Sequence, residues 1–386
     1  MVHVLVLGGG FGGVAAAHQL RNLLSADDEV TLIAASDTFF VGFAKLWELG
    51  DVRPLAEGTR SLSSLENHRI RYVNAEITAI DASACSVETS AGAFTADGMI
   101  VALGATHPAK HATFFGTGVH NVYSAQALPG LKQALLAAAE TGADENATVV
   151  ISILGAPYLC PPAPFEAALI VDEWLRQREC RDRVDLVVST PQPITLPVAG
   201  PDASHFLSEQ LKARGVRVLT EHKVEDIDSD GTIRFGNGEE LRGSLIAGVP
   251  AAAPPPVVAS SQLAADGGWI KPDPRTFATS FDRIYAAGDC TLVPTANAQL
   301  PKAGVFAEAE GRVAATNLAA DLIGGSRAEF DGHGYCFLEL PGRKVARVEG
   351  NFYAEPRPDV VLSAPDAASF AAKQQWESQR LSEWFE

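Results

Sequence analysis

Short apolar runs alternate with longer stretches rich in Ala and Leu along most of the chain. The run Val2–Leu7 leads into a helix-like stretch over Val14–Leu24, and a second run follows at Glu29–Ala34. The same order returns at Ala147–Leu154, before a predicted helix over Ala167–Arg178. Strands that alternate with helices are typical of parallel sheets covered by helices. The pattern therefore predicts an α/β fold.

The first strand and helix are joined by a run of glycines with one aromatic residue: Gly8, Gly9, Gly10, Phe11, Gly12 and Gly13. In a strand–turn–helix context, the first glycine (Gly8) permits the turn and the second (Gly10) lets the backbone approach a pyrophosphate. The third, Gly13, lets the helix pack close to the strand. The helix N-terminus adds free N–H groups and a partial positive charge. The segment is predicted to bind a dinucleotide.

An acid that binds the adenosine ribose is expected at the end of the second strand. That position is Ala34, so Ser36 or Asp37 would have to act from just beyond the strand. The alternative, that Asp37 only caps a turn, stays open. The segment 38–49 holds no Cys, His or Tyr, so no covalent flavin link is predicted.

Composition and charge narrow the classes of partner. The chain has 386 residues, 47% of them hydrophobic, which suits two to three domains with a sizeable core. Its formal charge of -17 argues against nucleic acid or an anionic membrane surface as the main partner. The sequence contains no apolar run of about 18 residues, so no transmembrane helix is predicted. No secretion signal is recognised at the N-terminus. A cytoplasmic or peripheral membrane location is expected.

The five cysteines are Cys85, Cys160, Cys180, Cys290 and Cys336. They form no CxxC pair, and no His stands at metal-ligand spacing from them, so no metal site is predicted. In a chain without a secretion signal, a disulfide is expected to be catalytic rather than structural.

The segment after the strand at 147–154 is Gly155-Ala156-Pro157-Tyr158-Leu159-Cys160-Pro161-Pro162-Ala163-Pro164-Phe165-Glu166. Proline lacks an N–H donor, so a loop with four prolines and one glycine is a poor phosphate cradle. We therefore predict that this loop binds no pyridine nucleotide. It instead holds Cys160 beside the start of the next helix, where a lowered thiol pKa is expected.

Two later segments resemble the paired motifs of flavoproteins with two dinucleotide-binding domains. One is Met99–Ala105, which contains Ala102 and Gly104, and the other is Asp282–Cys290, which contains Gly288 and Asp289. The resemblance implies non-covalently bound FAD, with Asp289 holding the ribityl chain. It also implies an FAD domain at about 1–110 and 245–330, a second Rossmann-like domain at 111–244, and a C-terminal segment at 331–386.

The loop around Cys160 resembles the first redox-cysteine motif of the sulfide:quinone oxidoreductase and flavocytochrome c sulfide dehydrogenase group. Cys336, within Gly334–Glu339, resembles the second redox cysteine of that group. Alternatively, Cys336 is a buried, unreactive thiol. A third cysteine, found in many quinone-linked relatives, is absent from Asn121–Gln126, and the chain has no Cys-x-x-Cys-His haem motif.

The resemblance implies oxidation of sulfide, a polysulfide or a persulfide, with electrons passing through FAD to a quinone or a cytochrome. Cys160 would carry sulfur and Cys336 would lie nearer the flavin. Glu166 would accept a proton or, alternatively, only complement the helix dipole. Lys302, which precedes a helix predicted at Ala307–Leu322, would lie beside the flavin, the alternative being an exposed lysine at a helix start.

The rival functions are an NAD(P)H-dependent disulfide or quinone reductase, which requires a glycine-rich loop at 155–166, and an electron carrier whose cysteines are incidental. The aromatic C-terminal stretch Phe370–Phe385 allows a peripheral membrane contact, packing onto the protein, or a homodimer contact.

Overall fold

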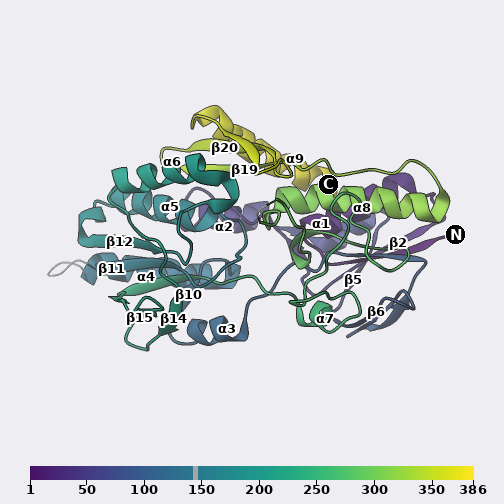
Figure 1. Ribbon diagram of the computed structural model, residues 1–386, viewed down its shortest axis with the longest axis horizontal. Coiled ribbons are helices and arrows are strands. Elements are labelled where there is room, and N and C mark those ends of the chain that lie inside the picture. The colour runs from purple at the N-terminus through teal and green to yellow at the C-terminus, as the bar shows by residue number, and fades with distance from the viewer. Residues whose placement is uncertain (142–146, 297) are drawn as a thin grey trace.

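The computed structural model describes residues 1–141, 147–296 and 298–386. It has two α/β lobes side by side, and the C-terminal segment lies across both of them (Figure 1). Each lobe is built on a five-stranded parallel sheet.

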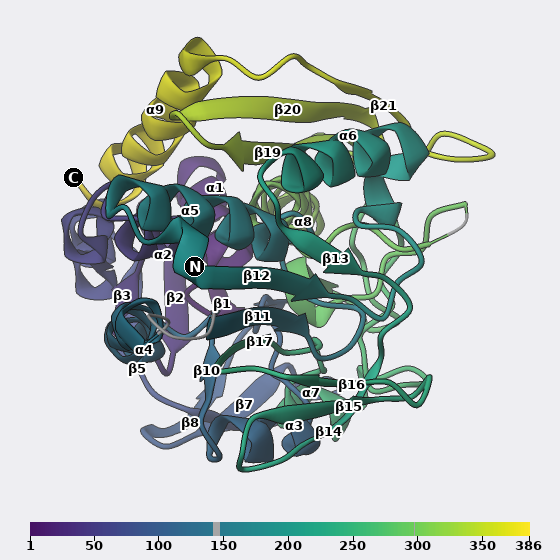
Figure 2. The ribbon, with the colours of Figure 1, turned by 90° about the vertical axis from the view of Figure 1, so that its left-hand side faces the viewer.

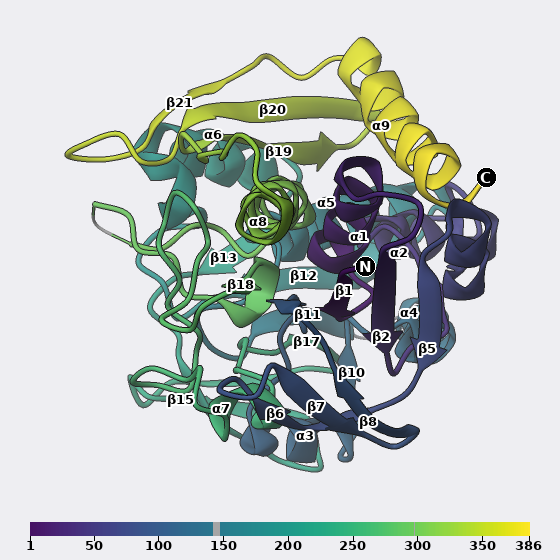
Figure 3. The same ribbon diagram turned by 90° about the vertical axis from the view of Figure 1, so that its right-hand side faces the viewer.

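The first lobe contains the N-terminal strand. Its sheet has the order β18-β9-β1-β2-β5. The strands are β1 (His3–Leu7), β2 (Glu29–Ala34), β5 (Arg71–Asn74), β9 (Gly98–Val101) and β18 (Ile284–Ala286). Helices α1 (Phe11–Leu23) and α8 (Gly304–Ile323) cover one face, and the antiparallel strands β6 (Ile77–Asp81), β7 (Ser86–Thr89) and β8 (Gly92–Thr95) cover the other (Figure 3).

Strand β1 shows why this sheet forms. Val4 and Val6 pack toward α1 and α8, whereas Leu5 and Leu7 pack toward the antiparallel strands, and all four are fully buried. A strand covered on both faces reads as a continuous apolar run instead of an alternating one. The run predicted at Val2–Leu7 is therefore a central strand.

The second lobe has the sheet order β10-β17-β11-β12-β13. The strands are β10 (Val119–Asn121), β17 (Leu245–Val249), β11 (Ala147–Ile153), β12 (Val184–Ser189) and β13 (Arg217–Leu219). One face packs against α4 (Leu128–Thr141), α5 (Ala163–Gln177) and α6 (Gly200–Ala213). The other packs against α3 (Ala109–Phe115) and the strands β14 (Val224–Ile227), β15 (Thr232–Phe235) and β16 (Glu240–Arg242), as Figure 2 shows.

The sheet topology shifts one predicted boundary. The sequence placed the return to the first domain at residue 245, but β17 pairs with both β10 and β11 in the second sheet. The second lobe therefore extends through Val249. An apolar strand such as β17 fits the core of either lobe, so its sequence alone does not assign it.

The C-terminal segment is a three-stranded antiparallel sheet followed by a helix. Its elements are β19 (His333–Leu340), β20 (Lys344–Asn351), β21 (Asp359–Leu362) and α9 (Ala367–Phe385). The side chains of Phe370, Trp376, Leu381, Trp384 and Phe385 are buried against the protein. Of the three interpretations of this stretch, packing onto the protein accounts for its aromatic residues. No helix in the described part of the chain is long and apolar enough to span a bilayer.

Three helices begin earlier than predicted. Helix α1 begins at Phe11, α5 at Ala163 and α8 at Gly304, so each includes glycine or proline in its first turns. The first N–H groups of a helix have no partner within the helix, so Pro164, which lacks this donor, costs little in the first turn of α5. The remaining elements of the described residues are the short strands β3 (Thr38–Phe39) and β4 (Arg60–Ser61) and the helices α2 (Ala44–Leu49) and α7 (Pro256–Ala259), besides short 3₁₀ helices, the longest of them Leu62–His68.

Candidate active site

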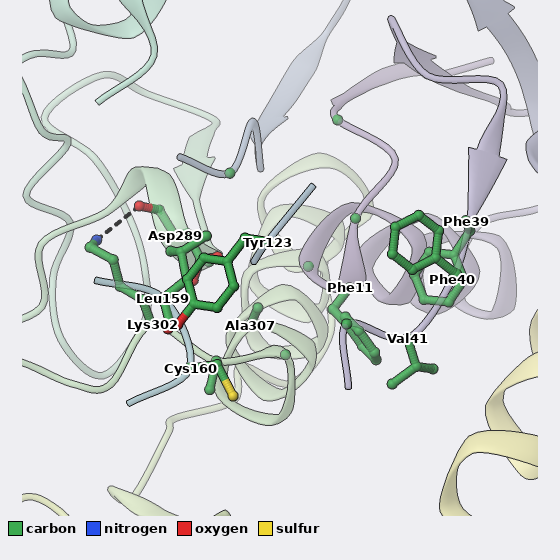
Figure 4. A pocket seen from close by; sticks show the side chains of 18 of the residues that line it. Phe11, Phe39, Phe40, Val41, Tyr123, Leu159, Cys160, Asp289, Lys302 and Ala307 are labelled. Carbon is green, nitrogen blue, oxygen red and sulfur yellow. Dashed lines mark hydrogen bonds between the residues drawn. The ribbon is translucent and has the colours of Figure 1, made fainter. Parts of the chain in front are cut away.

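A cavity of about 680 Å³ lies where the two lobes and the C-terminal segment meet (Figure 4). Its volume is in the range of roughly 300–1,000 Å³ that is usual for ligand and cofactor sites. The wall contains the turn between β1 and α1, the ends of β9 and β18, the loop before α5, and parts of α2, β19 and α9. The site-residue predictions that line it are Gly8, Gly10, Phe11, Gly12, Ser36, Ala102, Gly104, Cys160, Glu166, Gly288, Asp289, Lys302 and Cys336.

The glycine turn has the geometry of a pyrophosphate cradle. A Cβ on Gly8, where φ is +112°, would stand 2.1 Å from the carbonyl oxygen of Ala102. A Cβ on Gly13 would stand 1.9 Å from the carbonyl oxygen of Gly8, so Gly13 serves helix–strand packing and does not line the cavity. Nothing lies within 4 Å of a Cβ on Gly10. Gly10 therefore leaves open backbone at the helix N-terminus, as a bound phosphate requires.

Phe11 has a second role that the glycine motif does not reveal. Its ring stacks on Trp376 at 5.6 Å between centroids and meets the edge of Phe39 at 5.1 Å. Trp376 lies in α9, so the cofactor turn and the C-terminal helix pack directly against each other. In Figure 4, Phe11, Phe39 and Val41 lie on the side of the cavity opposite Cys160.

Of the two residues predicted to bind the adenosine ribose, Ser36 and Asp37, only Ser36 lines the cavity. Ser36 lines the cavity, and its hydroxyl donates to the carbonyl oxygen of Thr38. Asp37 is exposed and is not part of the wall, and its carbonyl oxygen accepts a bond from the N–H of Leu62. The acidic side chain that lines this end is Glu76, which follows β5. Sequence reasoning missed it because the fingerprint looks for an acid after β2.

Asp289 has a carboxylate suited to a polar ligand. Burial raises its pKa, whereas the nearby charge of Lys302 lowers it. No described residue donates a hydrogen bond to this carboxylate, although it faces the cavity. A half-buried carboxylate that faces a cavity and has no protein donor fits hydroxyl donors of a bound cofactor such as the ribityl chain of FAD.

Lys302 is buried, which rules out the alternative of an exposed lysine at a helix start. Its Nζ donates to the carbonyl oxygens of Asp289 at 2.8 Å and Thr291 at 2.7 Å, and it lies 3.9 Å from the ring of Trp269 (Figure 4). The neighbouring N–H of Gly288 donates to Glu310, whose pKa burial raises to about 7. Gly288 therefore shapes the wall, but its N–H is already engaged.

Cys160 and Cys336 come from distant parts of the chain and line the same cavity. Cys160 lies in the loop before α5 with a φ of +48°, and its N–H donates to the carbonyl oxygen of Lys302. Cys336 lies on β19 opposite Val348. All five cysteines are free thiols, and the other three do not line the cavity.

The predicted low pKa of Cys160 is wrong. Burial raises the pKa of this thiol to about 12, and the Glu166 carboxylate acts in the same direction, against the smaller opposing effects of Lys373 and Lys45. Burial also raises the pKa of Cys336, with the charge of Cys160 adding to the shift. Desolvation of a thiolate here outweighs the helix N-terminus. In the reduced protein the shift favours the neutral thiol form of both groups.

Glu166 belongs to a buried ion cluster that the sequence did not reveal. Lys373 of α9 donates to Glu339 of β19 at 2.7 Å, and its Nζ lies 3.6 Å from the Glu166 carboxylate of α5. The Glu166 carboxylate also accepts the N–H of Glu339 at 2.7 Å, and Trp47 donates to Glu339 at 2.8 Å. Burial raises the pKa of Glu166 although Lys373 opposes the shift.

A second lysine, Lys45 of α2, also lines the cavity. Its Nζ donates to the carbonyl oxygen of Tyr123 at 2.7 Å and lies 5.7 Å from the ring of Phe40. Neither Lys45 nor Lys373 belongs to a recognisable motif, because each reaches the site only through the tertiary fold.

The start of α5 has few free donors for a nucleotide phosphate. The N–H groups of Phe165 and Glu166 both donate to the carbonyl oxygen of Pro162, and Pro164 has no N–H. The buried Glu166 carboxylate adds negative charge to the same turn. These features oppose the binding of a pyrophosphate, which needs free N–H groups and a positive potential.

Comparisons with known proteins agree with this architecture. Residues 2–311 match the family model described as pyridine nucleotide-disulphide oxidoreductase. The sulfide-quinone reductase of Aquifex aeolicus is 27% identical over 349 residues, which cover 83% of this chain and 76% of that protein. The type II NADH:quinone oxidoreductase of Staphylococcus saprophyticus is 24% identical over 348 residues, which cover 85% of this chain and 84% of that protein.

Among solved structures, the sulfide:quinone oxidoreductase from Aquifex aeolicus is similar with a TM-score of 0.86 and 22% identity, covering 99% of this chain and 91% of that one. The likeness extends over both lobes and the C-terminal segment. Since the family model spans most of the sequence, the chain belongs to the pyridine nucleotide-disulphide oxidoreductases and is an FAD-dependent oxidoreductase of α/β fold.

Proposed function

We propose that the protein oxidises sulfide, or a polysulfide or persulfide, through the redox pair Cys160 and Cys336, and passes the electrons by way of FAD to a quinone or a cytochrome. The observation that carries the proposal is the presence of both cysteines in the wall of the cavity that begins at the glycine turn. The similarity to the sulfide-quinone reductase of Aquifex aeolicus supports the same substrate class.

The chemistry begins with the oxidised pair. Hydrosulfide attacks the Cys160 sulfur, a new S–S bond forms to Cys160, and the Cys160–Cys336 bond breaks. Cys160 then carries a persulfide, and Cys336 leaves with the electron pair as a thiolate. The disulfide is the two-electron oxidant of this exchange, and bound FAD would supply the acceptor for the two electrons that must leave when the pair is oxidised again. Burial raises the pKa of the Cys336 thiol, so the thiolate is its less stable form in this environment.

Glu166 is the proposed proton acceptor. Its carboxylate lines the cavity, and burial raises its pKa above the usual value of a glutamate, which favours uptake of a proton. In the competing interpretation, Glu166 only complements the helix dipole. That interpretation does not account for the contacts of its carboxylate with Glu339 and Lys373. Lys302 is proposed to hold the loop at Asp289 against the cofactor, through its two backbone acceptors.

A quinone is the acceptor favoured by the wall of the cavity. Tyr335, Phe337 and Trp376 line the part formed by the C-terminal segment, and aromatic side chains suit a flat ring. The relative from Aquifex aeolicus is named for a quinone, which supports this choice over a cytochrome. A quinone dissolved in a bilayer would require a peripheral membrane contact, whereas a water-soluble acceptor would not.

Oxidation of NADH is the second candidate function. The likeness to the type II NADH:quinone oxidoreductase of Staphylococcus saprophyticus favours it. The start of α5 opposes binding of NADH, because the N–H groups of Phe165 and Glu166 already donate to a carbonyl oxygen of the same turn, and Glu166 adds a carboxylate there.

The proposal can be tested by treating the oxidised holoenzyme anaerobically with sulfide and measuring the mass of the cysteine peptides. We expect one added sulfur atom on the Cys160 peptide, and sulfide-dependent reduction of a soluble quinone analogue. Cys160→Ser and Cys336→Ser should abolish the quinone reduction, whereas Cys180→Ser, buried outside the cavity, should retain it. Full quinone reduction by Cys160→Ser would refute the role of the pair.

A further inference from the structure

Lys45 is a cation in the cavity that the reaction outlined above does not use. It lies on α2, and its ammonium donates one bond to the carbonyl oxygen of Tyr123. The rings of Phe40 and Tyr123 lie 5.7 and 5.5 Å from its Nζ. An ammonium carries three N–H donors, and no other described residue accepts a bond from this one. Two donors therefore remain for a molecule in the cavity.

The charge of Lys45 also lacks a counterion. No carboxylate of the described residues forms an ion pair with it, whereas Lys373 in the same wall is paired with Glu166 and Glu339. Burial lowers the pKa of Lys45 to about 8, and a negative charge on Cys160 acts in the opposite direction. A half-buried charge without a partner is unfavourable, so this position is stabilised whenever an anion occupies the space beside Cys160.

The surroundings of Lys45 indicate what kind of anion fits. Phe40, Leu159 and Tyr123 line the cavity with Lys45 and present mainly apolar surface. The Tyr123 hydroxyl donates to the carbonyl oxygen of Leu159 and is therefore not a free donor for a ligand. A phosphate or a dicarboxylate needs several donors and more than one positive charge. A small monoanion with a polarisable atom needs only the single ammonium.

We propose that Lys45 is the anion-binding residue of the sulfur-substrate site, and that it holds a hydrosulfide or small persulfide anion beside Cys160. This inference rests on the proposed function, because it names the charge state in which that substrate is bound. In this role Lys45 contacts the attacking sulfur and orients it toward the Cys160 sulfur.

The test uses an anionic and a neutral alkylating reagent of similar size, iodoacetate and iodoacetamide. Reduced holoenzyme carrying Cys336→Ser is treated with each reagent, and modification of Cys160 is followed by mass spectrometry. Both reagents require the thiolate, so the ratio of the two rates cancels any change in the Cys160 pKa. The ratio therefore reports only whether an anion is favoured at this position, and no sulfide turnover is needed.

We expect the ratio of iodoacetate to iodoacetamide rates to fall by roughly tenfold or more in Lys45→Met, as expected when one nearby charge is removed from a poorly solvated site. Lys45→Arg should keep most of the preference. Lys110→Met is the matched control, because the Lys110 ammonium also donates to a backbone carbonyl and lies over an aromatic ring, but outside the cavity. It should leave the ratio unchanged.

An unchanged ratio in Lys45→Met would overturn the inference, and so would an equal fall in Lys110→Met. Because the labelling does not depend on oxidation of sulfide, the two proposals fail separately. If Cys160 prefers the anionic reagent but gains no sulfur from sulfide, the proposed function is wrong and the anion site stands. If Cys160 gains sulfur but shows no preference for the anionic reagent, the anion site is wrong and the proposed function stands.

Discussion

Replacing Lys373 by Met removes the only cation of the buried cluster with Glu166 and Glu339. All three side chains are almost completely buried, at 1%, 2% and 5% exposed for Lys373, Glu166 and Glu339. Burial alone would lower the pKa of Lys373, but the two carboxylates raise it instead. Without the lysine, two carboxylates face each other in the interior with no compensating charge.

The cost follows from linkage between protonation and folding. Removing one partner of a buried ion pair typically costs about 3–5 kcal/mol in the free energy of unfolding. Glu166 reduces this cost by holding a proton, because its pKa, already raised by burial, rises further when the opposing charge of Lys373 is removed. A raised carboxyl pKa destabilises the fold only above the unfolded pKa, and each pH unit with one extra bound proton costs about 1.4 kcal/mol.

The stability deficit of Lys373→Met should therefore be small near pH 5 and greater by about 3 kcal/mol at pH 7. The assay is urea unfolding of both proteins at the two pH values with excess FAD. Lys212→Met is the control, because Lys212 is exposed and its 3.8 Å pair with Glu209 should contribute less than about 1 kcal/mol. A deficit below about 1 kcal/mol at pH 7, or one that does not grow between pH 5 and pH 7, would refute the account of the cluster.

Three further predictions concern the cavity. Gly13→Ala should lower the unfolding temperature, because the new Cβ would stand 1.9 Å from the carbonyl oxygen of Gly8. Gly10→Ala should leave the unfolding temperature of the apoprotein unchanged, because nothing lies within 4 Å of the new Cβ, but should weaken FAD binding in a fluorescence titration. Asp289→Ala should also weaken FAD binding without lowering apoprotein stability, since no described residue bonds to the carboxylate; unchanged affinity would contradict its assignment. The preference of Cys160 for iodoacetate should disappear as pH rises through about 8, where Lys45 loses its proton; a preference that persists at pH 10 would exclude Lys45 as its source.

The parts of the site that depend on local sequence were predictable. A glycine turn between an apolar strand and a helix has one structural solution, so Gly8, Gly10 and Gly13 could be given separate roles from their order along the chain. The loop with Cys160 was equally informative, since each of its four prolines lacks an N–H donor whatever the fold around it.

The electrostatics of the site depend on the tertiary fold and were not predictable. Lys373 reaches Glu166 from a helix more than 200 residues further along the chain, in a segment whose alternating charges resemble any solvated helix. The pKa of Cys160 was predicted in the wrong direction because the helix N-terminus is a local feature, whereas burial comes from several distant segments. Strand β17 was placed in the wrong lobe because both sheets accept a short apolar strand.

The most direct test of the central claim is an anaerobic titration of the FAD-loaded protein with sulfide, followed by flavin absorbance, beside the same titration with NADH. The account predicts that sulfide bleaches the flavin, that NADH does not, and that Cys160→Ser and Cys336→Ser lose the response to sulfide. Bleaching by NADH alone would contradict it, and would make the protein a pyridine-nucleotide-dependent reductase despite the loop before α5.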